Sequence, residues 1–387
     1  ITVMSTHRSH NLRLSSVLQQ GLVLALVAAV FYLLSSNAAL NLKHLNIASG
    51  FGFLSQRAGY DISFSLIDYT PDATYARAYL VGLLNTLLVS VLSIVLATLL
   101  GGALGMARVS DNWLIKRLSG TCIEFLRNVP LVVHLVWWYG LVLALPGVKH
   151  SASLFGVVFL NNNGLNLPWL EQGGLVGWGL ALMALGTLLG YLICRYKEAR
   201  APWRGFASRR WPALLAGAVL LPLLVYAMSD AHVQWEVPVP HGFGFKGGIT
   251  LVPEMLALVL ALSFYSASYI AEIVRGAIES VHRGQYEAAR ALGFKSGPTM
   301  RQLIVPQAIY PMIPQITNTY LNIVKNSSLG VVIGFMELVS STGGTTLNQT
   351  GQAIECIALV MGTYCAISLV ISLGMNIYNH RIGQRGH

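Results

Sequence analysis

The chain has 387 residues, of which 54% are hydrophobic and only 10% are charged, and its mean hydropathy is +0.60. Soluble domains carry about 25% charged residues, so this composition excludes an ordinary soluble protein and indicates a membrane protein. The net charge of +10 would suit nucleic-acid binding, so the positions of the basic residues must decide between a nucleic-acid surface and a membrane topology signal.

Eight apolar stretches are long enough to cross a bilayer as helices, since a hydrocarbon core of about 30 Å takes roughly 20 apolar residues. In chain order they are about 19–36, 79–106, 121–146, 173–195, 211–228, 252–275, 309–335 and 354–378. The sequence therefore predicts an all-α polytopic membrane protein with about eight transmembrane helices. The first stretch also resembles the core of a cleaved signal peptide, and we favour a retained signal-anchor helix.

The basic residues follow the topology that these stretches predict, because Lys and Arg concentrate in cytoplasmic segments. With the N-terminus inside, all but six of the 25 basic residues fall in inner segments. The six exceptions are Lys43, Arg57, Arg77, Lys149, Lys246 and Lys325. The positive charge is therefore a topology signal rather than a nucleic-acid footprint, and it predicts a multi-pass protein with both termini in the cytoplasm.

The sequence carries no recognisable motif for catalysis, metal binding or phosphate binding. The four cysteines form no CxxC pair and have no metal-ligand spacing to a histidine. A membrane-embedded enzyme would need a motif such as HExxH or GxSxG, and a nucleotide-binding chain would need a Gly-x-x-x-x-Gly-Lys-Ser/Thr loop. We therefore expect a non-catalytic chain with no metal or cofactor of its own. An ion-gradient-driven secondary amino acid transporter stays as the alternative, although the internal repeats typical of that class are not found.

The longest polar interval of the C-terminal third is 285–308, QYEAARALGFKSGPTMRQLIVPQA, and it falls on the predicted cytoplasmic side. Strong helix formers occupy 286–292, and Gly293 suits the position just past a helix end, where a positive φ is common. Ser296 and Pro298 are start signals for a second helix, as cap and first-turn residues. The interval therefore predicts a helix, a sharp turn and a second helix that present a small surface to a partner.

This interval resembles the EAA loop of ABC importer permeases. That motif is EAA, three residues, Gly, nine residues and I-x-L-P; here Glu287-Ala288-Ala289, Gly293 and Leu303-Ile304-Val305-Pro306 match it, with Leu303 and Val305 replacing the motif's Ile and Leu. Three more segments are similar to polar amino acid importers: IEFLRNVPL at 123–131, AEIVRG at 271–276 followed by GQ at 284–285, and KNSSL at 325–329 followed by EL at 337–338. The enlarged layout is similar to permeases of general L-amino acid importers.

The resemblance implies a MetI-like permease core of five helices plus three extra helices. It divides the chain into an N-terminal helix with a periplasmic loop (1–74), a first part of the core (75–147), an inserted helix pair with loops (148–250) and a second part of the core with the EAA loop at about 283–308 (251–387). It implies that this loop docks on a separate ATPase, and that the coupling residues are Glu287, Ala288, Ala289, Arg290 and Gly293.

The implied function is that of the permease subunit of an ATP-driven amino acid importer in the bacterial inner membrane. The implied partners are an ATP-binding cassette ATPase dimer that binds ATP and magnesium, a second and related permease subunit, and a periplasmic amino-acid-binding protein. The amino acid substrate would cross the lipid bilayer at the interface between the two permeases. Nucleic acid is not an expected partner.

Ionisable side chains inside spans cost roughly 2.5–3.5 kcal/mol each on insertion scales, so each is a functional candidate. Glu124 and Arg127 are three residues apart and can pair along one helix, and Glu272 and Arg275 have the same spacing. For Glu272 two alternatives stay open, contact with a substrate ammonium group and a role as an anchor between helices.

Lys325 has two possible roles, pairing with Glu337 or accommodating a substrate carboxylate. Asn318 and Asn322 are four residues apart on the same expected helix, where they either line a passage or join helices. Prolines at 306, 311 and 314 would bend the start of this helix. The expected pathway residues are therefore Arg127, Glu272, Asn318, Asn322 and Lys325.

Overall fold

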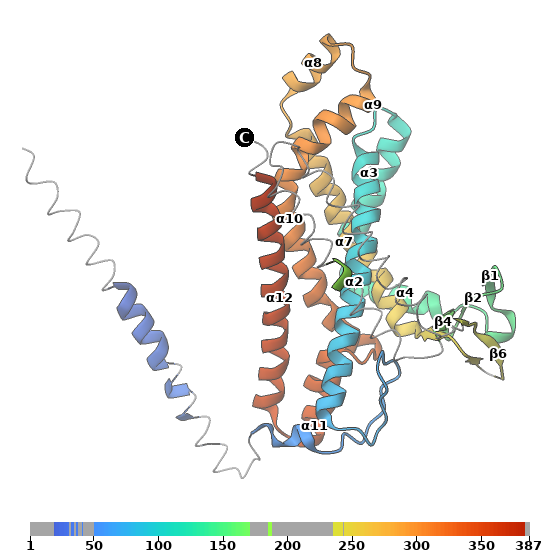
Figure 1. The fold of residues 1–387 in the computed structure, drawn as a ribbon, viewed down its shortest axis with the longest axis vertical. Helices are drawn as coiled ribbons and strands as arrows, with labels where there is room; N and C mark the ends of the chain where they lie inside the picture. The colour runs from blue at the N-terminus through green and yellow to red at the C-terminus, as the bar shows by residue number, and fades with distance from the viewer. Residues whose placement is uncertain are drawn as a thin grey trace, which may run out of the picture.

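The computed structural model of the chain describes residues 19–30, 32–34, 36, 37, 41, 50–170, 185–187, 235–242 and 244–383. Within these residues, long helices form a bundle with a helical loop at one end and a small group of strands at its side (Figure 1). The predicted spans at 173–195 and 211–228 fall almost entirely outside the described residues.

Two long helices, α2 (Tyr75–Arg108) and α7 (Pro253–Glu279), pack side by side in the centre of the bundle. Two glycines of α2 make this contact close. A Cβ on Gly101 would lie 2.6 Å from Ile270 Cβ, and a Cβ on Gly105 would lie 2.7 Å from the backbone of α7. Small residues bring the two backbones together, as they do at helix interfaces in membranes.

The span expected at 121–146 is instead two helices, α3 (Trp113–Asn128) and α4 (Leu131–Leu143), which meet at an angle of 103°. The break falls at Val129 and Pro130. A proline lacks an N–H, and its ring keeps the preceding residue out of the helical region. Val129 is accordingly extended, with φ −89° and ψ 129°. The prediction of one continuous span was wrong because this local rule overrides apolar composition.

The C-terminal half leaves the bundle after α7 and returns to it. The loop contains α8 (Arg283–Ala291) and α9 (Ser296–Thr299), and the return runs through a π-helical turn (Met300–Ile304) into α10 (Val305–Asn326). A 3-10 segment (Ser327–Ile333), a π-helical segment (Val339–Thr346) and α11 (Leu347–Thr350) lead to α12 (Ala353–Gly383). Figure 1 places α8 and α9 at one end of the bundle and α11 at the other.

Short strands occupy 152–170 and 235–251, on both sides of the predicted inserted helix pair, which corrects the expectation of an all-α chain. One sheet has the order β1-β2-β3-β8, and two further strand pairs are β4–β5 and β6–β7. The strands are β1 (Ala152–Leu154), β2 (Val158–Asn161), β3 (Gly164–Leu167), β4 (Trp169–Leu170), β5 (Trp235–Glu236), β6 (Val239–His241), β7 (Gly244–Lys246) and β8 (Ile249–Leu251). With two to four residues each, they are too short to show the alternation that reveals a strand in a sequence.

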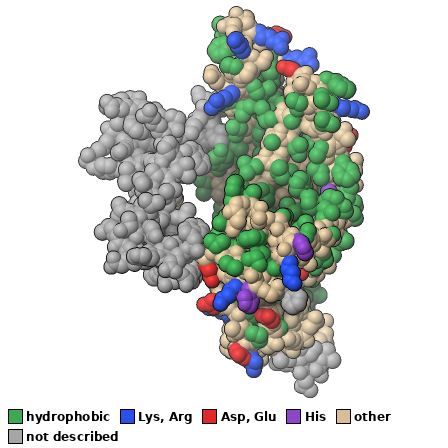
Figure 2. Space-filling model, turned by 90° about the vertical axis from the view of Figure 1, so that its right-hand side faces the viewer, with side chains coloured by type: hydrophobic (Ala, Val, Ile, Leu, Met, Phe, Trp, Pro, Cys, Tyr) green, Lys and Arg blue, Asp and Glu red, His purple; other side chains and the backbone are tan. Residues whose placement is uncertain are grey.

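Three described helices are long and apolar enough to cross a membrane: Tyr75–Arg108, Pro253–Glu279 and Ala353–Asn379. The bent pair of α3 and α4 makes a fourth candidate if it counts as one span. On the face drawn in Figure 2, charged side chains gather towards the two ends and hydrophobic side chains form a band between them. The chain is therefore a mostly helical membrane protein, with three or four candidate spans among its described residues.

Residues 50–74, which include a 3-10 turn at Phe51–Ser55, cover the end of the bundle opposite α8 (Figure 1). A second 3-10 turn, Val148–His150, follows α4. Phe53 is buried beside Tyr75, and the Tyr60 hydroxyl lies 3.0 Å from Thr346 Oγ1. This segment therefore packs on the bundle as a lid of aromatic side chains and fixes the end at which α2 and α12 begin.

Candidate functional site

The loop that carries the EAA motif begins with α8, a short helix outside the bundle. His282 caps it, because the Nδ1 atom of its ring accepts a hydrogen bond from the N–H two residues on, at 3.1 Å. Glu287, Ala288 and Arg290 are exposed, whereas Ala289 is buried. One face of α8 therefore contacts the rest of the protein and the other is open to a partner.

The end of α8 is fixed by a left-handed turn at Gly293, where φ is 77°. The Gly293 N–H donates to the Arg290 carbonyl at 2.9 Å, and the Phe294 N–H donates to the Ala289 carbonyl at 3.0 Å. These two hydrogen bonds form a Schellman motif, which needs a residue that tolerates positive φ just past the helix. The predicted helix, sharp turn and second helix are confirmed.

The second helix of the loop differs from the prediction in its first residue. Ser296 was expected to be the cap, but it is the first helical residue of α9, and Lys295 occupies the cap position with no side-chain hydrogen bond. Pro298 lies in the first turn, as expected. The π-helical turn that follows joins α9 to α10 without a break in the helical path.

Two large apolar side chains at the tip of the loop were missed by the sequence reasoning. Leu292 and Phe294 come directly after the helix that carries the motif, and they are 77% and 47% exposed. With Ala288, Ala289 and residues of the second helix they line a pocket of about 320 Å³. Apolar residues that flank a glycine turn in an otherwise polar loop are the signal that could have found them. The loop therefore offers an apolar surface as well as charges.

The base of the loop belongs to a hydrophobic cluster that it shares with α7 and α10. Ile304 is fully buried in this cluster with Ile270 and Ile278 of α7, and Tyr286 of α8 packs against it. Burial raises the pKa of the Tyr286 phenol, and the Glu279 carboxylate adds a smaller contribution in the same direction. Tyr286 is therefore uncharged at neutral pH and can pack as an aromatic anchor. A displacement of α8 would reach α7 and α10 directly.

Charged residues form a chain of contacts along α7 at the end that carries the loop. Arg275 donates from Nε to Glu272 at 3.0 Å and also pairs with Glu279 one turn further on. The predicted pairing of Glu272 with Arg275 is confirmed. Because its carboxylate already has this partner, Glu272 is held along its own helix.

The predicted pairing of Glu124 with Arg127 was wrong. Glu124 lies 3.7 Å from the guanidinium of Arg108 at the end of α2, and the Arg127 guanidinium lies 5.4 Å above the ring of Tyr269. Spacing along one helix allowed the first pairing, but neighbours from α2 and α7 provide the actual contacts. The Tyr269 hydroxyl lies 3.0 Å from that of Tyr265, so an aromatic pair that the sequence did not single out supports Arg127.

One face of α10 carries exposed polar side chains. Asn318, Asn322 and Lys325 are all exposed, and Gln315 continues the same face. At 3.6 residues per turn these four positions lie within about 80° of one another. The structure thus aligns three of the five expected pathway residues. Arg127 and Glu272 lie instead near the loop, at the opposite end from Lys325.

Glu337 does not pair with Lys325, which corrects the other expectation for this region. Glu337 is fully buried, and its carboxylate accepts from the backbone N–H groups of Val339 and Ser340 at 2.9 and 2.8 Å and from the Tyr364 hydroxyl at 3.1 Å. Lys325 is exposed. The carboxylate thus caps the helical segment that begins at Val339 and ties it to α12, a structural role.

Within the described ranges, no cluster brings together the three His, Cys, Asp or Glu residues that would hold a metal ion. In that part of the chain, two features that expose polar side chains are the loop at one end and the polar face of α10. The fold and these two features define the class, a polytopic helical membrane protein with an exposed helical loop at one end.

Comparison with known proteins identifies the family. Residues 209–385 match the family described as "Binding-protein-dependent transport system inner membrane component". The Escherichia coli (strain K12) amino-acid ABC transporter permease protein YhdX is 47% identical over 93% of this chain and 92% of its own length. The general L-amino acid transport system permease protein AapQ of Rhizobium johnstonii is 42% identical over 95% and 92%. The chain therefore belongs to the amino-acid ABC transporter permease family.

A third relative extends the same pattern. The glutamate/glutamine/aspartate/asparagine transport system permease protein BztB of Rhodobacter capsulatus is 37% identical over 96% of this chain and 95% of its own length. Such proteins are the membrane components of transport systems rather than enzymes. The resemblance of the chain to the amino acid importer permeases is thereby confirmed.

Proposed function

We propose that this chain is the transmembrane permease subunit of an ATP-driven amino acid importer of the bacterial inner membrane, and that it couples to a separate ATPase through the loop at 283–308. The observation that carries the proposal is the geometry of that loop. It combines a Schellman turn at Gly293 with an exposed Glu287, and Ala288, Leu292 and Phe294 line a pocket of about 320 Å³ beside them.

The loop suits force transmission because its two sides have different surroundings. Glu287 is exposed and free to meet a partner, while Tyr286 and Ile304 belong to the hydrophobic cluster shared with α7 and α10. Packed interiors move as units rather than deforming gradually. Movement of an attached ATPase would therefore be passed to α7 and α10 as a shift of whole helices.

The polar face of α10 supports a passage between this permease and a second, related one. Asn318, Asn322 and Lys325 are exposed in the single chain. Polar groups at membrane depth are costly next to lipid, so they favour a protein partner or a water-filled passage. Lys325 would then attract the carboxylate of an amino acid. The pathway lies at the interface of the two permeases, and ATP binding in the ATPase dimer switches it between inward and outward access.

The remaining partners follow from this arrangement. ATP and magnesium are bound by the ATPase subunits, and a periplasmic amino-acid-binding protein delivers the substrate to the end opposite α8. Both termini of the chain are cytoplasmic, as the distribution of basic residues predicts.

Association with the ATPase is the direct test of the coupling role. Tagged chain is purified from native membranes in mild detergent, and co-purifying ATPase is quantified for the wild type, for Glu287→Lys and for Glu236→Lys. The last variant makes the same charge change at an exposed site on β5, away from the loop. We expect Glu287→Lys to lose the ATPase and amino acid uptake while both variants insert into the membrane normally.

Two outcomes would contradict the proposal. Amino acid uptake at the wild-type rate by Glu287→Lys would show that the exposed face of α8 does not contact the ATPase. The second outcome is that no ATPase co-purifies with the wild-type chain and that an ion gradient drives uptake in vesicles. This result would assign the protein to the secondary transporters instead.

A further inference from the structure

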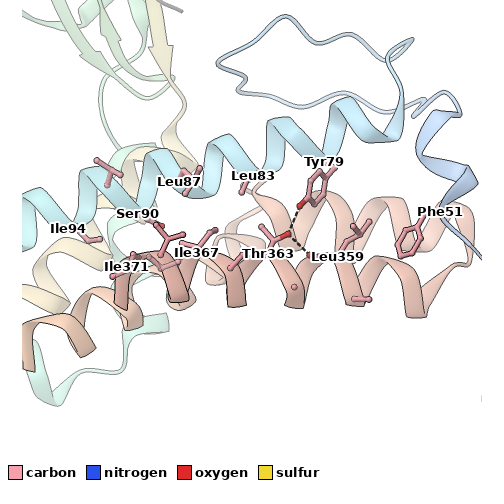
Figure 3. Close-up of a pocket in the computed structure, with 16 residues that line it drawn as sticks. Phe51, Tyr79, Leu83, Leu87, Ser90, Ile94, Leu359, Thr363, Ile367 and Ile371 are labelled. Carbon is pink, nitrogen blue, oxygen red and sulfur yellow. Dashed lines mark hydrogen bonds between the residues drawn. The ribbon is translucent and has the colours of Figure 1, made fainter. Parts of the chain in front are cut away.

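A long apolar groove runs between α2 and α12 and is left open in the bundle. Its volume is about 740 Å³, and Leu83, Leu87, Ile367 and Ile371 are among its lining residues. Figure 3 shows these side chains on the facing sides of the two helices, with a hydrogen bond of 2.6 Å between Tyr79 and Thr363 near one end. Apart from that bridge the groove is almost entirely hydrocarbon, so its occupant must be apolar.

The α12 side of the groove carries a stripe of small residues at four-residue spacing, Ala358, Gly362 and Ala366 (the α12 stripe). Small residues at this spacing allow another helix to approach closely in a membrane. A Cβ on Gly362 would have no neighbouring atom within 4 Å among the described residues. Gly101, where α2 does pack closely on α7, shows the opposite: its Cβ would lie 2.6 Å from a side chain. The α12 stripe therefore has the composition of a helix–helix contact, but no described helix packs against it at Gly362.

The first helix of the chain, Gln19–Leu34, has the matching pattern. This helix is apolar, and its described side chains are exposed. In Figure 1 it lies away from the bundle. Gly21, Ala25 and Ala29 form a second stripe of small residues at four-residue spacing (the first-helix stripe). Its 16 residues extend about 24 Å as a helix, and the lining of the groove extends about 22 Å from Tyr79 to Ile94 of α2.

The chain is tied to the end of the groove where α12 begins. The Gly50 N–H donates to Glu355 Oε1 at 2.6 Å, and Phe51 itself lines the groove. The fifteen residues at 35–49 can span up to about 50 Å, so they easily connect the first helix to this point. Because Leu34 is the end nearest Gly50 in the chain, a first helix in the groove would run antiparallel to α12.

In that antiparallel arrangement the two stripes are in register. Counted from Leu34, the members of the first-helix stripe lie five, nine and 13 residues away. Counted from Ala353, the start of α12, the members of the α12 stripe lie five, nine and 13 residues away. At 1.5 Å per residue each member therefore meets its counterpart at the same depth, about 7, 13 and 20 Å from the shared end.

We propose that Gln19–Leu34 packs in the groove between α2 and α12 of its own chain, with the first-helix stripe against the α12 stripe. Lipid chains cannot reproduce the close contact that two small-residue stripes make, and in a bilayer this packing is what drives helices together. A second copy of the chain offers the same helix without the tether at Gly50. The tether raises the effective concentration to the millimolar range, which favours the helix of the same chain. This inference concerns the assembly of the chain itself and does not depend on its role in transport.

Disulfide trapping in native membranes tests the proposal, since paired cysteines need Cα atoms about 4.4–6.8 Å apart. In a full-length chain whose four native cysteines are replaced by alanine, two pairs are introduced: Ala25→Cys with Gly362→Cys, and Ala29→Cys with Ala358→Cys. The matched control combines Val27→Cys with Gly362→Cys, because residue 27 lies on the opposite face of the helix from 25 and 29. A protease site placed within 38–49 reports whether the first helix stays linked after cleavage.

We expect both stripe pairs to link within monomers, at about ten times the yield of the control, because residues two apart do not face the same way. Cleavage would then release the first helix only after reduction. Linked dimers would assign the groove to a second copy. Equal yields for all three pairs, or no link in any of them, would mean that the groove is filled by lipid or by another segment, and either result would overturn the proposal.

Discussion

Two interruptions of the helical bundle, the loop at 283–308 and the turn at 327–346, handle their polar groups in opposite ways. In the loop the backbone satisfies itself through the Schellman turn at Gly293, and the side chains of Glu287 and Phe294 are left exposed. In the turn a buried side chain, Glu337, satisfies the backbone. The loop thus leaves side chains free for the partner proposed above, whereas the turn uses a side chain to hold the fold.

Both segments carry residues of the family motifs, so the motifs alone do not show which glutamate is exposed and which one holds the fold. The difference in burial shows it. Glu287 and Glu337 are both glutamates within matched segments. The first is exposed, and the second is 0% exposed with four hydrogen-bond donors, of which Thr86 Oγ1 at 3.5 Å is the most distant. Substitutions at the two positions should therefore separate loss of coupling from loss of stability.

The largest expected effect is the loss of stability on substitution of the buried Glu337. Glu337→Ala leaves the Val339 and Ser340 amides and the Tyr364 hydroxyl without an acceptor. Unsatisfied buried groups cost about 1–3 kcal/mol each, so the variant should lose about 3 kcal/mol or more of stability. Thermal unfolding of the detergent-purified chain, followed by size-exclusion fluorescence, should show a marked fall in Tm.

Glu287→Ala is the control for this experiment, because it removes a carboxylate that is exposed. Its Tm should stay at the wild-type value, since exposed substitutions usually change stability by about 0.5 kcal/mol or less. Equal Tm values for the two variants would mean that the Glu337 carboxylate does not hold the turn to α12.

A smaller effect is expected at the turn of the exposed loop. At a φ of 77°, a β-branched residue in place of Gly293 is strained by about 1–2 kcal/mol or more. Gly293→Val should therefore unwind the end of α8 and weaken ATPase binding about tenfold, the equivalent of 1.4 kcal/mol, while the Tm of the bundle changes little. Binding of purified ATPase to the permease in nanodiscs measures this effect.

Gly293→Asn gives the matched control, because asparagine tolerates the left-handed region far better than valine. It should retain most of the ATPase affinity. If valine and asparagine weaken binding equally, the loss comes from the added side chain rather than from the backbone, and the turn geometry is not what positions the loop.

How well the sequence predicted each feature depended on whether local or distant contacts decide it. The loop was predicted correctly because its helix formers and Gly293 act on their own neighbours. The bend at Pro130 is also local, but a search for apolar length alone does not see it. The pairing of Glu124 failed for a different reason: Arg108 reaches it from another helix, and no rule of spacing along one helix contains that contact.

The same reasoning explains the two ends of α10. The spacing of Asn318 and Asn322 predicted that they share one face of a helix, and both lie on one face of α10. Spacing along the chain suggested that Lys325 pairs with Glu337, but Glu337 turns inward to cap the segment that follows it. The short strands at 152–170 and 235–251 left no periodic signal, since pairing between distant residues defines them.

The smallest expected change in stability is at Lys325, which lies next to the buried turn but takes no part in its hydrogen bonds through its side chain. Lys325→Ala should leave the Tm within about 0.5 kcal/mol of wild type, because the ammonium group is exposed and Glu337 is satisfied by other donors. Under the proposed function it should weaken substrate affinity about tenfold, since a charged hydrogen bond contributes about 1.5–3 kcal/mol. Lys325→Arg keeps the charge and should restore much of this affinity. Concentration-dependent uptake in proteoliposomes, measured beside the Tm, separates the two roles: an unchanged KM in Lys325→Ala would remove Lys325 from the pathway, and a large fall in Tm would place it with Glu337 on the structural side of the comparison.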